Sequence, residues 1–275
     1  MNLGSLIGNV VPIVLAMSLF GCNLQDRMLY YPEPSVPSKE ALAANHLQFW
    51  PSGPEGYRGF IGTEGPAAPR GTIVVFHGNA GTAADRFYYL KALEPLGYRV
   101  ILAEYPRYGR RGGELGEGSF VADARESIRR ASQYGRPLYL LGESLGCAVA
   151  AGVASNPSPR IDGVLLITPW DTLKAVAKSH FPFLPVGLFL RDRYDSGENL
   201  KTFPGRIAVV GAERDEIVPV RHAEALYRSL PGSNKRMWTL RGVGHNDWLM
   251  AAGPEIWREF MAFLEEDAEA SHPPP

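Results

Sequence analysis

Ser144 is the residue that best fits a nucleophile, because it lies at the centre of the sequence Gly142-Glu-Ser-Leu-Gly146. The apolar run 137–142 before it is typical of a buried strand, and the small side chains of 147–155 suit a close-packed helix. Strand, G-x-S-x-G and helix in this order predict a nucleophile elbow, a turn that holds the serine hydroxyl above the end of a sheet. Chance alone supplies the bare pattern in roughly one such chain in five, so the remaining residues decide the matter.

An activated serine needs a base to take its proton and an acid to orient that base. In an open α/β sheet such groups lie on loops at the carboxyl ends of strands. Asp215 follows the predicted strand 206–211, and His245 follows the predicted strand 236–241 in a loop bracketed by glycines. The order Ser144, Asp215, His245 matches that of nucleophile, acid and base in enzymes with this elbow. We therefore predict these three residues as a catalytic triad.

Other acidic residues compete for the orienting position. Asp171, after the predicted strand 163–168, is the strongest rival of Asp215, and Glu213 and Glu216 are weaker candidates. The structural alternative for Asp215 is a helix cap or a surface pair with Arg214.

The remaining polar candidates have simpler interpretations. His180 and His222 are expected to be structural, and His77 is expected to hydrogen-bond the loop that contains it. Asp247 either holds the loop of His245 through hydrogen bonds or lies on the surface.

The tetrahedral oxyanion formed by an attacked carbonyl needs hydrogen-bond donors. The expected donors are the backbone N–H of Leu145, directly after the nucleophile, and that of Asn79. Asn79 lies in His77-Gly-Asn-Ala-Gly81, where glycines allow the backbone to approach a substrate closely.

Short apolar strands that alternate with amphipathic helices predict the fold class, an α/β fold with a mostly parallel sheet covered on both faces. The predicted strands are 71–76, 99–104, 137–142, 163–168, 206–211 and 236–241, with 47–50 and 57–62 as short antiparallel strands at the edge. The predicted helices are 83–96, 119–134, 144–155, 220–230 and 254–267.

The segment 170–204 interrupts this alternation. Two helical patches separated by Phe181-Pro-Phe-Leu-Pro185 predict a short cap over the carboxyl edge of the sheet, and long insertions in a compact domain are usually functional. We expect one domain over 47–268, preceded by an extended tether over 23–46 and followed by a disordered tail over 269–275. The stretch up to about Pro37 is expected to be extended chain that lies over the domain, or a tether.

Residues 1–22 carry no charged side chain. Leu19-Phe-Gly-Cys22 resembles the lipobox of bacterial lipoproteins, in which the cysteine is lipidated after cleavage; that would place the protein in the cell envelope. Alternatively, the run is an uncleaved membrane anchor, and Arg27 would then keep the domain on the cytoplasmic side. A buried helix of the fold is the third interpretation. The lipoprotein and the anchor interpretations both predict an N-terminus that is associated with a membrane.

Composition excludes several other functions. A net charge of -1 and the lack of a basic stripe speak against nucleic-acid binding. The two cysteines lie in different parts of the chain, which makes a disulfide framework improbable, and the six histidines lack the spacing of metal ligands. We expect no cofactor and no metal, and a small-molecule or acylated substrate as the partner.

Several of these motifs together resemble those of one protein family. The chain resembles the α/β-hydrolase superfamily, and within it the BEM46-like (ABHD13- and ABHD17-like) group related to serine aminopeptidase S33 domains. The resemblance rests on stretches spread over 28–265, namely Tyr30-Tyr-Pro32, His77-Gly-Asn-Ala-Gly81, Gly142-Glu-Ser-Leu-Gly146, Phe181-Pro-Phe-Leu-Pro185, Arg191-Asp-Arg-Tyr-Asp195, Glu213-Arg-Asp-Glu-Ile-Val-Pro219 and Gly244-His-Asn-Asp247.

The resemblance implies the same triad of Ser144, Asp215 and His245, and an ion pair between Arg191 and Asp192 in the cap. It leads us to expect a serine hydrolase that cleaves ester or thioester bonds. An S33-like peptidase is the second expectation, and a membrane-tethered binding protein without turnover is the third.

Overall fold

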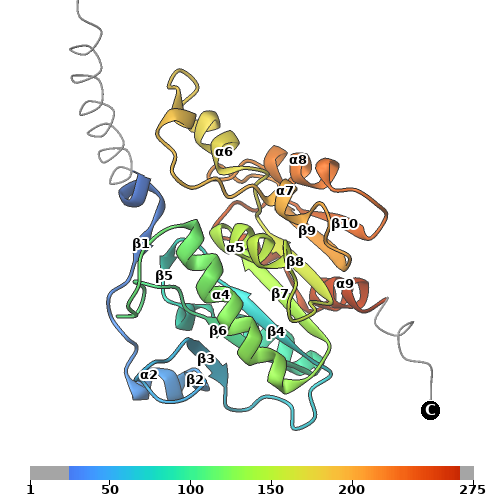
Figure 1. Ribbon diagram of the computed structural model, residues 1–275. Helices are drawn as coiled ribbons and strands as arrows, with labels where there is room; N and C mark the ends of the chain where they lie inside the picture. The colour runs from blue at the N-terminus through green and yellow to red at the C-terminus, as the bar shows by residue number, and fades with distance from the viewer. Residues whose placement is uncertain (1–24, 267–275) are drawn as a thin grey trace, which may run out of the picture.

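The computed structural model describes residues 25–266, in which an eight-stranded sheet forms the centre of the molecule (Figure 1). Strands β2 and β3 pair antiparallel, as do β3 and β6, and the other neighbours are parallel. The strands, in the order in which they lie side by side, are β10 (Lys235–Leu240), β9 (Arg206–Ala212), β8 (Gly163–Ile167), β7 (Leu138–Glu143), β4 (Gly71–Phe76), β6 (Tyr98–Ala103), β3 (Gly59–Gly62) and β2 (Leu47–Trp50).

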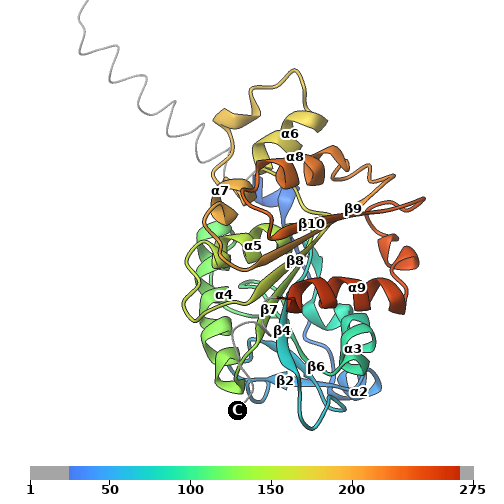
Figure 2. The same ribbon diagram turned by 90° about the vertical axis from the view of Figure 1, so that its right-hand side faces the viewer.

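Helices cover both faces of this sheet (Figure 2). On one face lie α4 (Glu117–Ala131), α5 (Leu145–Ala154) and α8 (Arg221–Ser229); on the other lie α3 (Tyr88–Leu93) and α9 (Pro254–Glu265). A parallel strand buried on both sides must be apolar on both sides. Strand β4 illustrates this, since Val74 and Phe76 join the core under α4 and α5 while Ile73 and Val75 join the core under α3 and α9.

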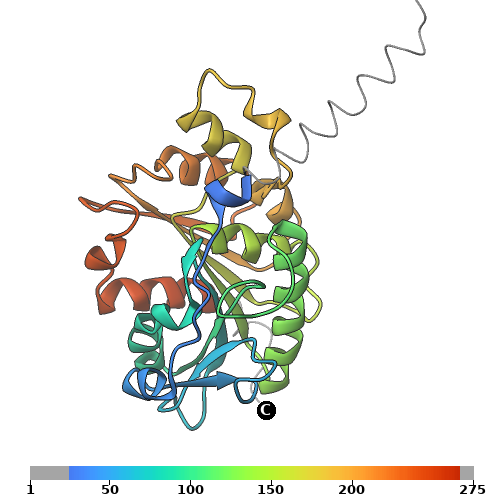
Figure 3. The same cartoon turned by 90° about the vertical axis from the view of Figure 1, so that its left-hand side faces the viewer.

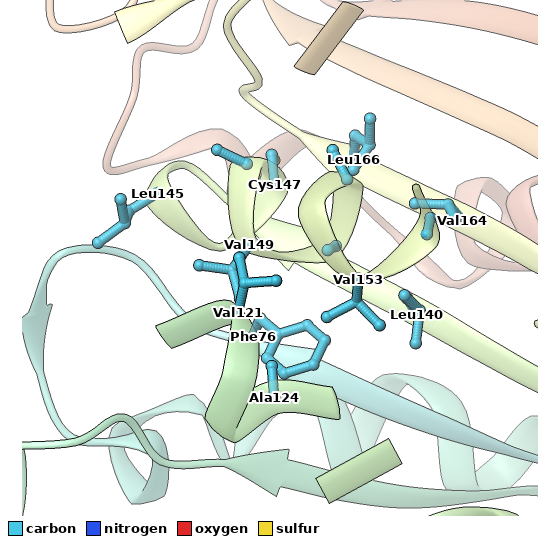
Figure 4. Close-up of a cluster of buried hydrophobic side chains, with 14 of the residues drawn as sticks. Phe76, Val121, Ala124, Leu140, Leu145, Cys147, Val149, Val153, Val164 and Leu166 are labelled. Atoms are coloured by element: carbon cyan, nitrogen blue, oxygen red, sulfur yellow. The ribbon is translucent and has the colours of Figure 1, made fainter. Parts of the chain in front are cut away.

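The core under α4 and α5 is packed closely (Figure 4). A side chain on Gly152 of α5 would lie only 2.6 Å from Cγ2 of Val121 on α4. The run of small residues after Ser144 therefore lets α4 and α5 pack closely against each other on the same face of the sheet. Cys147, in this run, is fully buried, as expected of a small residue.

The parallel α/β fold predicted from the sequence is confirmed, with most boundaries shifted by one or two residues. The helix expected over 83–96 differs, because it is divided into η1 (Ala83–Arg86), α3 and η2 (Glu94–Leu96). The side chain of Asp85 accepts the backbone N–H of Thr82 at 2.7 Å, which starts a separate short turn, and Pro95 lies in the last piece, where it lacks an N–H for helical bonding.

The chain before the sheet packs on the domain, where the sequence left open an extended chain lying over the domain or a tether (Figure 3). Strand β1 (Tyr31–Pro32) pairs with β5 (Ala80–Gly81), and α2 (Lys39–Ala44) is a helix capped by Ser38, whose hydroxyl accepts the N–H of Ala41. The physical reason is that Tyr30 finds a buried site: its hydroxyl donates to Asp192 at 2.7 Å.

The predictions for residues 1–22, including Cys22, and for the tail 269–275 lie outside the described residues. Within residues 25–266, no helix combines the length and the apolar character needed to cross a membrane.

The segment between β8 and β9 covers the carboxyl edge of the sheet. It contains α6 (Leu173–His180), η4 (Val186–Leu188) and α7 (Ser196–Leu200). We call residues 170–204 the cap. Arg191 and Asp192 form the ion pair that the resemblance implied, with 2.9 Å between Nη2 and Oδ2. Buried Gln25 donates to the same carboxylate at 2.5 Å, so the N-terminal segment and the cap are joined by a polar contact.

The turn between β7 and α5 is strained in the manner expected of a nucleophile elbow. Ser144 has φ 53° and ψ −115°, in the region that favours glycine. A side chain on Gly142 would lie 2.5 Å from the Gly146 carbonyl oxygen, and one on Gly146 would overlap the Phe76 carbonyl oxygen of β4. Both flanking glycines are therefore required by direct backbone contacts.

We predict that Gly146→Ala lowers the free energy of unfolding by about 2–3 kcal/mol, because the added methyl group must displace the end of β4. Urea unfolding measures this, with Gly118→Ala as the matched control, since a side chain at Gly118 of α4 meets nothing within 4 Å. Equal stability of the two variants would contradict the contact between the elbow and β4.

Candidate active site

The structure brings Ser144, His245 and Asp215 together at the carboxyl edge of the sheet. His245 Nε2 lies 2.9 Å from Ser144 Oγ, and His245 Nδ1 lies 2.7 Å from Asp215 Oδ2. Ser144 follows β7, Asp215 follows β9 and His245 follows β10, so three strands of one sheet position the three side chains. With Nδ1–H donated to Asp215, Nε2 is free to accept the serine hydroxyl, which is the arrangement of a general base.

The Asp215 carboxylate is fixed by its own turn. Its Oδ1 accepts the backbone N–H of Ile217 at 3.0 Å and that of Val218 at 2.6 Å, while Oδ2 faces the imidazole. The side chain is 1% exposed and that of His245 is 9% exposed. Backbone donors and burial hold the carboxylate in one orientation, which in turn holds the ring toward Ser144.

The loop of His245 is held by two further carboxylates. Asp247 accepts the backbone N–H of Gly244 at 2.5 Å, and Glu213 accepts that of Gly242 at 2.8 Å. The structure therefore supports the interpretation in which Asp247 hydrogen-bonds the loop of His245. Glu213 supports the same loop from β9 and does not face the imidazole of His245.

The rival acid Asp171 has a different partner. Its Oδ1 lies 2.8 Å from His222 Nδ1, and the other nitrogen of His222 lies 2.9 Å from Ser179 Oγ in the cap. His222 therefore joins α8 to α6, which agrees with the structural interpretation. His180 lies 2.8 Å from the Ile217 carbonyl oxygen and also borders the pocket above Ser144.

The loop after β4 lies against the nucleophile. His77 is buried, with Nδ1 2.7 Å from the Gly78 carbonyl oxygen and Nε2 2.9 Å from Glu104 Oε1, so both ring nitrogens have acceptors. The hydroxyl of Tyr108 donates to the Asn79 carbonyl at 2.6 Å. The ring of His77 and the hydroxyl of Tyr108 thus fix the backbone of the loop from two sides.

Asn79 and Leu145, the predicted oxyanion donors, border the same pocket as Ser144. Leu145 is the first residue of α5, so its N–H has no acceptor within the helix. The arrangement leaves the N–H of Leu145 next to Ser144 at the positive end of α5, where negative charge is stabilised.

The pocket above Ser144 has a volume of about 690 Å³. It is bordered on the reactive side by Ser144, His245 and Asn79, and elsewhere mainly by apolar and aromatic side chains, including Met28, Leu29, Trp170, Leu173, Val176 and Trp248. Mixed apolar walls with a few convergent polar groups are typical of a small-molecule site.

Sequence reasoning missed a polar cluster around Glu143, the residue before the nucleophile. Its carboxylate accepts the hydroxyls of Tyr88 and Tyr89, the latter at 2.7 Å, and lies 3.5 Å from Arg86. Burial, followed by the Glu143 charge, raises the pKa of the Tyr88 hydroxyl, so it stays a donor. The only sequence signal was a glutamate within G-x-S-x-G, and nothing near it in sequence pointed to partners more than 50 residues away.

Comparisons with known proteins identify the superfamily of this chain. Residues 67–186 match the model of the serine aminopeptidase S33 family. An uncharacterized protein of Mycobacterium tuberculosis is 30% identical over 94% of this chain and 94% of its own length. The lysophosphatidylserine lipase ABHD12 of Danio rerio is 30% identical, over 56% of this chain and 46% of the lipase.

Among solved structures, an esterase of Pyrococcus furiosus superposes with a TM-score of 0.64 at 17% identity, covering 86% of this chain and 97% of the esterase. The parallel sheet, the elbow at the end of β7, the S33 match and the full-length relative lead to one conclusion. The chain belongs to the α/β-hydrolase superfamily.

Proposed function

We propose that the protein is a serine hydrolase that cleaves ester or thioester bonds of substrates with an apolar acyl group. The observation that carries this proposal is the continuous line of short contacts from Asp215 through His245 to the strained Ser144. A hydroxyl in such a line can be deprotonated as it attacks, without a metal or an organic cofactor.

The proposed reaction has two halves. Ser144 Oγ attacks the carbonyl carbon while His245 Nε2 takes the hydroxyl proton, and the backbone N–H groups of Asn79 and Leu145 stabilise the oxyanion. The protonated His245 then donates to the leaving alcohol or thiol, whose bond to the acyl carbon breaks. Water repeats the sequence against the acyl-enzyme and regenerates Ser144. Loss of one oxyanion donor typically costs about 3 kcal/mol of barrier.

An apolar groove in the cap supports an acyl substrate. Its volume is about 450 Å³, and Met28, Leu29, Leu173 and Val176 border both the groove and the pocket above Ser144. Among residues 25–266, Gln25 is the only polar side chain on its wall, and no charged side chain of that range borders it. A chain of methylene groups gains free energy by leaving water for such a groove.

The names of two similar proteins support the same chemistry. ABHD12 is named a lysophosphatidylserine lipase, and the Pyrococcus furiosus protein is named an esterase. Peptide hydrolysis is the second candidate, supported by the S33 match and by Glu143 at the pocket wall, which could meet an amino terminus. Glu143 already has Arg86, Tyr88 and Tyr89 as partners, so an ester is favoured.

We predict that Ser144→Ala abolishes hydrolysis of p-nitrophenyl butyrate and labelling by a fluorophosphonate probe. Asp215→Asn lowers kcat about 10⁴-fold, because an amide favours the wrong tautomer of His245. Asp171→Asn is the matched control and retains activity within tenfold of the unaltered protein, because its partner is His222. The assignment would be contradicted if Ser144→Ala hydrolysed the ester as fast as the unaltered protein, or if Asp171→Asn lost more activity than Asp215→Asn.

The same assay separates the alternatives. Faster cleavage of aminoacyl amides than of acyl esters and thioesters would favour the peptidase. Folded protein that neither turns over any of these substrates nor reacts with the fluorophosphonate would favour the binding protein without turnover.

We predict that Ala177→Phe, which fills the groove without altering the pocket of Ser144, lowers kcat/KM for a decanoyl ester more than tenfold and leaves the butyryl ester unchanged. Each methylene group that the Phe side chain keeps out of the groove loses about 0.8 kcal/mol of burial free energy, so exclusion of two methylene groups already accounts for a tenfold loss. Lys178→Phe, on the exposed side of α6, is the control. Equal losses for both chain lengths would mean that the groove does not hold the acyl chain.

A further inference from the structure

The loop between α6 and the end of η4 carries an exposed apolar surface. Phe183 is 97% exposed, Leu188 is 83% exposed and Leu184 is 58% exposed. We call these three side chains the cap tip. The loop lies at one end of the molecule, beyond α6 and away from the sheet (Figure 3). Large apolar side chains gathered in this way on a surface usually mark a contact with another apolar phase or protein.

The charged side chains of the segment 173–190, which contains the cap tip, have one sign. Between Thr172 and Arg191 the sequence holds Lys174, Lys178 and no acidic residue, in a chain whose net charge is -1. Both lysines are exposed, and neither has an ion-pair partner among residues 25–266. Lys174 also packs against the loop, since a side chain on Gly187 would lie 2.8 Å from its Cε. Lys174 therefore lies beside the loop of the cap tip, Lys178 lies one helical turn further along α6, and both are available to anions.

The cap tip is continuous with the proposed acyl groove. Leu184 belongs to both, and Phe181 and Phe189 border the groove next to it. The groove in turn adjoins the pocket of Ser144 through Leu173 and Val176. A path lined by apolar side chains thus joins the exposed end of the cap to the nucleophile.

The N-terminus of the described chain meets the same end of the molecule. Gln25 accepts the backbone N–H of Arg191 at 2.7 Å and donates to Asp192. The uncharged stretch 1–22 precedes it by only two residues in the sequence. The part of the chain with the longest apolar run therefore joins the described structure at the cap.

We propose that the cap tip docks on a lipid bilayer with anionic headgroups. Phe183, Leu184 and Leu188 would enter the apolar layer while Lys174 and Lys178 contact the headgroup phosphates. This interaction does not require turnover and so goes beyond the proposed function. Two copies of the chain meeting through their cap tips would bring their lysines together, which disfavours a self-contact.

The test places an environment-sensitive fluorophore on the cap tip of the full chain. Phe183→Cys carries the label in a background with Cys22→Ser, because Cys147 is buried. Glu55→Cys, exposed in the loop between β2 and β3, is the matched control. Strands β2 and β3 lie at the end of the molecule opposite to α6 (Figure 1). On vesicles of phosphatidylcholine with phosphatidylglycerol, we expect a blue shift and quenching by nitroxide-labelled lipids for the label at position 183 and neither change at position 55.

Two further variants separate the contributions. Lys174→Glu combined with Lys178→Glu should raise the lipid concentration needed for the shift on the anionic vesicles about tenfold. The protein with both lysines should need a similarly raised lipid concentration on vesicles of pure phosphatidylcholine. Leu188→Asp, added to the labelled Phe183→Cys protein, should abolish the blue shift on vesicles and keep full hydrolysis of p-nitrophenyl butyrate without vesicles, so failure of docking is distinguishable from failure of catalysis.

Three results would overturn the proposal. The first is vesicle-bound protein whose label at position 183 stays in water. The second is an equal shift on phosphatidylcholine alone. The third is a shift without vesicles that grows with protein concentration, which would identify the cap tip as a contact between copies of the chain.

Discussion

The contact between Gly146 and the carbonyl of Phe76 is the constraint on which the site depends. It brings the start of α5 against the end of β4, so that the serine turn and the loop 77–81 meet at one point of the sheet edge. Ser144 is then held at φ 53° by the strand before it and the helix after it. A backbone fixed on both sides keeps the Ser144 hydroxyl in one place at the edge of the sheet.

The same edge explains why the contacts among Ser144, His245 and Asp215 could be predicted from sequence. Ser144, Asp215 and His245 each follow a strand, and parallel strands end at a common edge, so chain order and strand position sufficed to choose them. Local pattern also gave the parallel strands, because their residues are apolar on both faces. These features depend on neighbours in sequence or on a general property of the fold.

Features that depend on distant side-chain pairs could not be predicted in this way. Glu143 and Tyr89 are 54 residues apart, and Tyr30 and Asp192 are 162 residues apart. Nothing local announces either pair, so the polar cluster beside the nucleophile and the packing of the N-terminal segment on the cap were missed. Burial acts to raise the pKa of Asp192, but hydrogen bonds from Arg191 and Tyr30 hold it below its usual value, so the carboxylate stays charged where the two segments meet.

The measurement that tests the central claim most directly is the mass of the protein trapped during turnover. Acid quenching within the first turnover of p-nitrophenyl butyrate, followed by peptide mapping, reports where the acyl group is bound. Our account predicts one butyryl group per chain on the peptide that contains Ser144, with none on peptides that contain Ser179. Acylation of another residue, or steady hydrolysis with no acylated chain under conditions that slow deacylation, would contradict it.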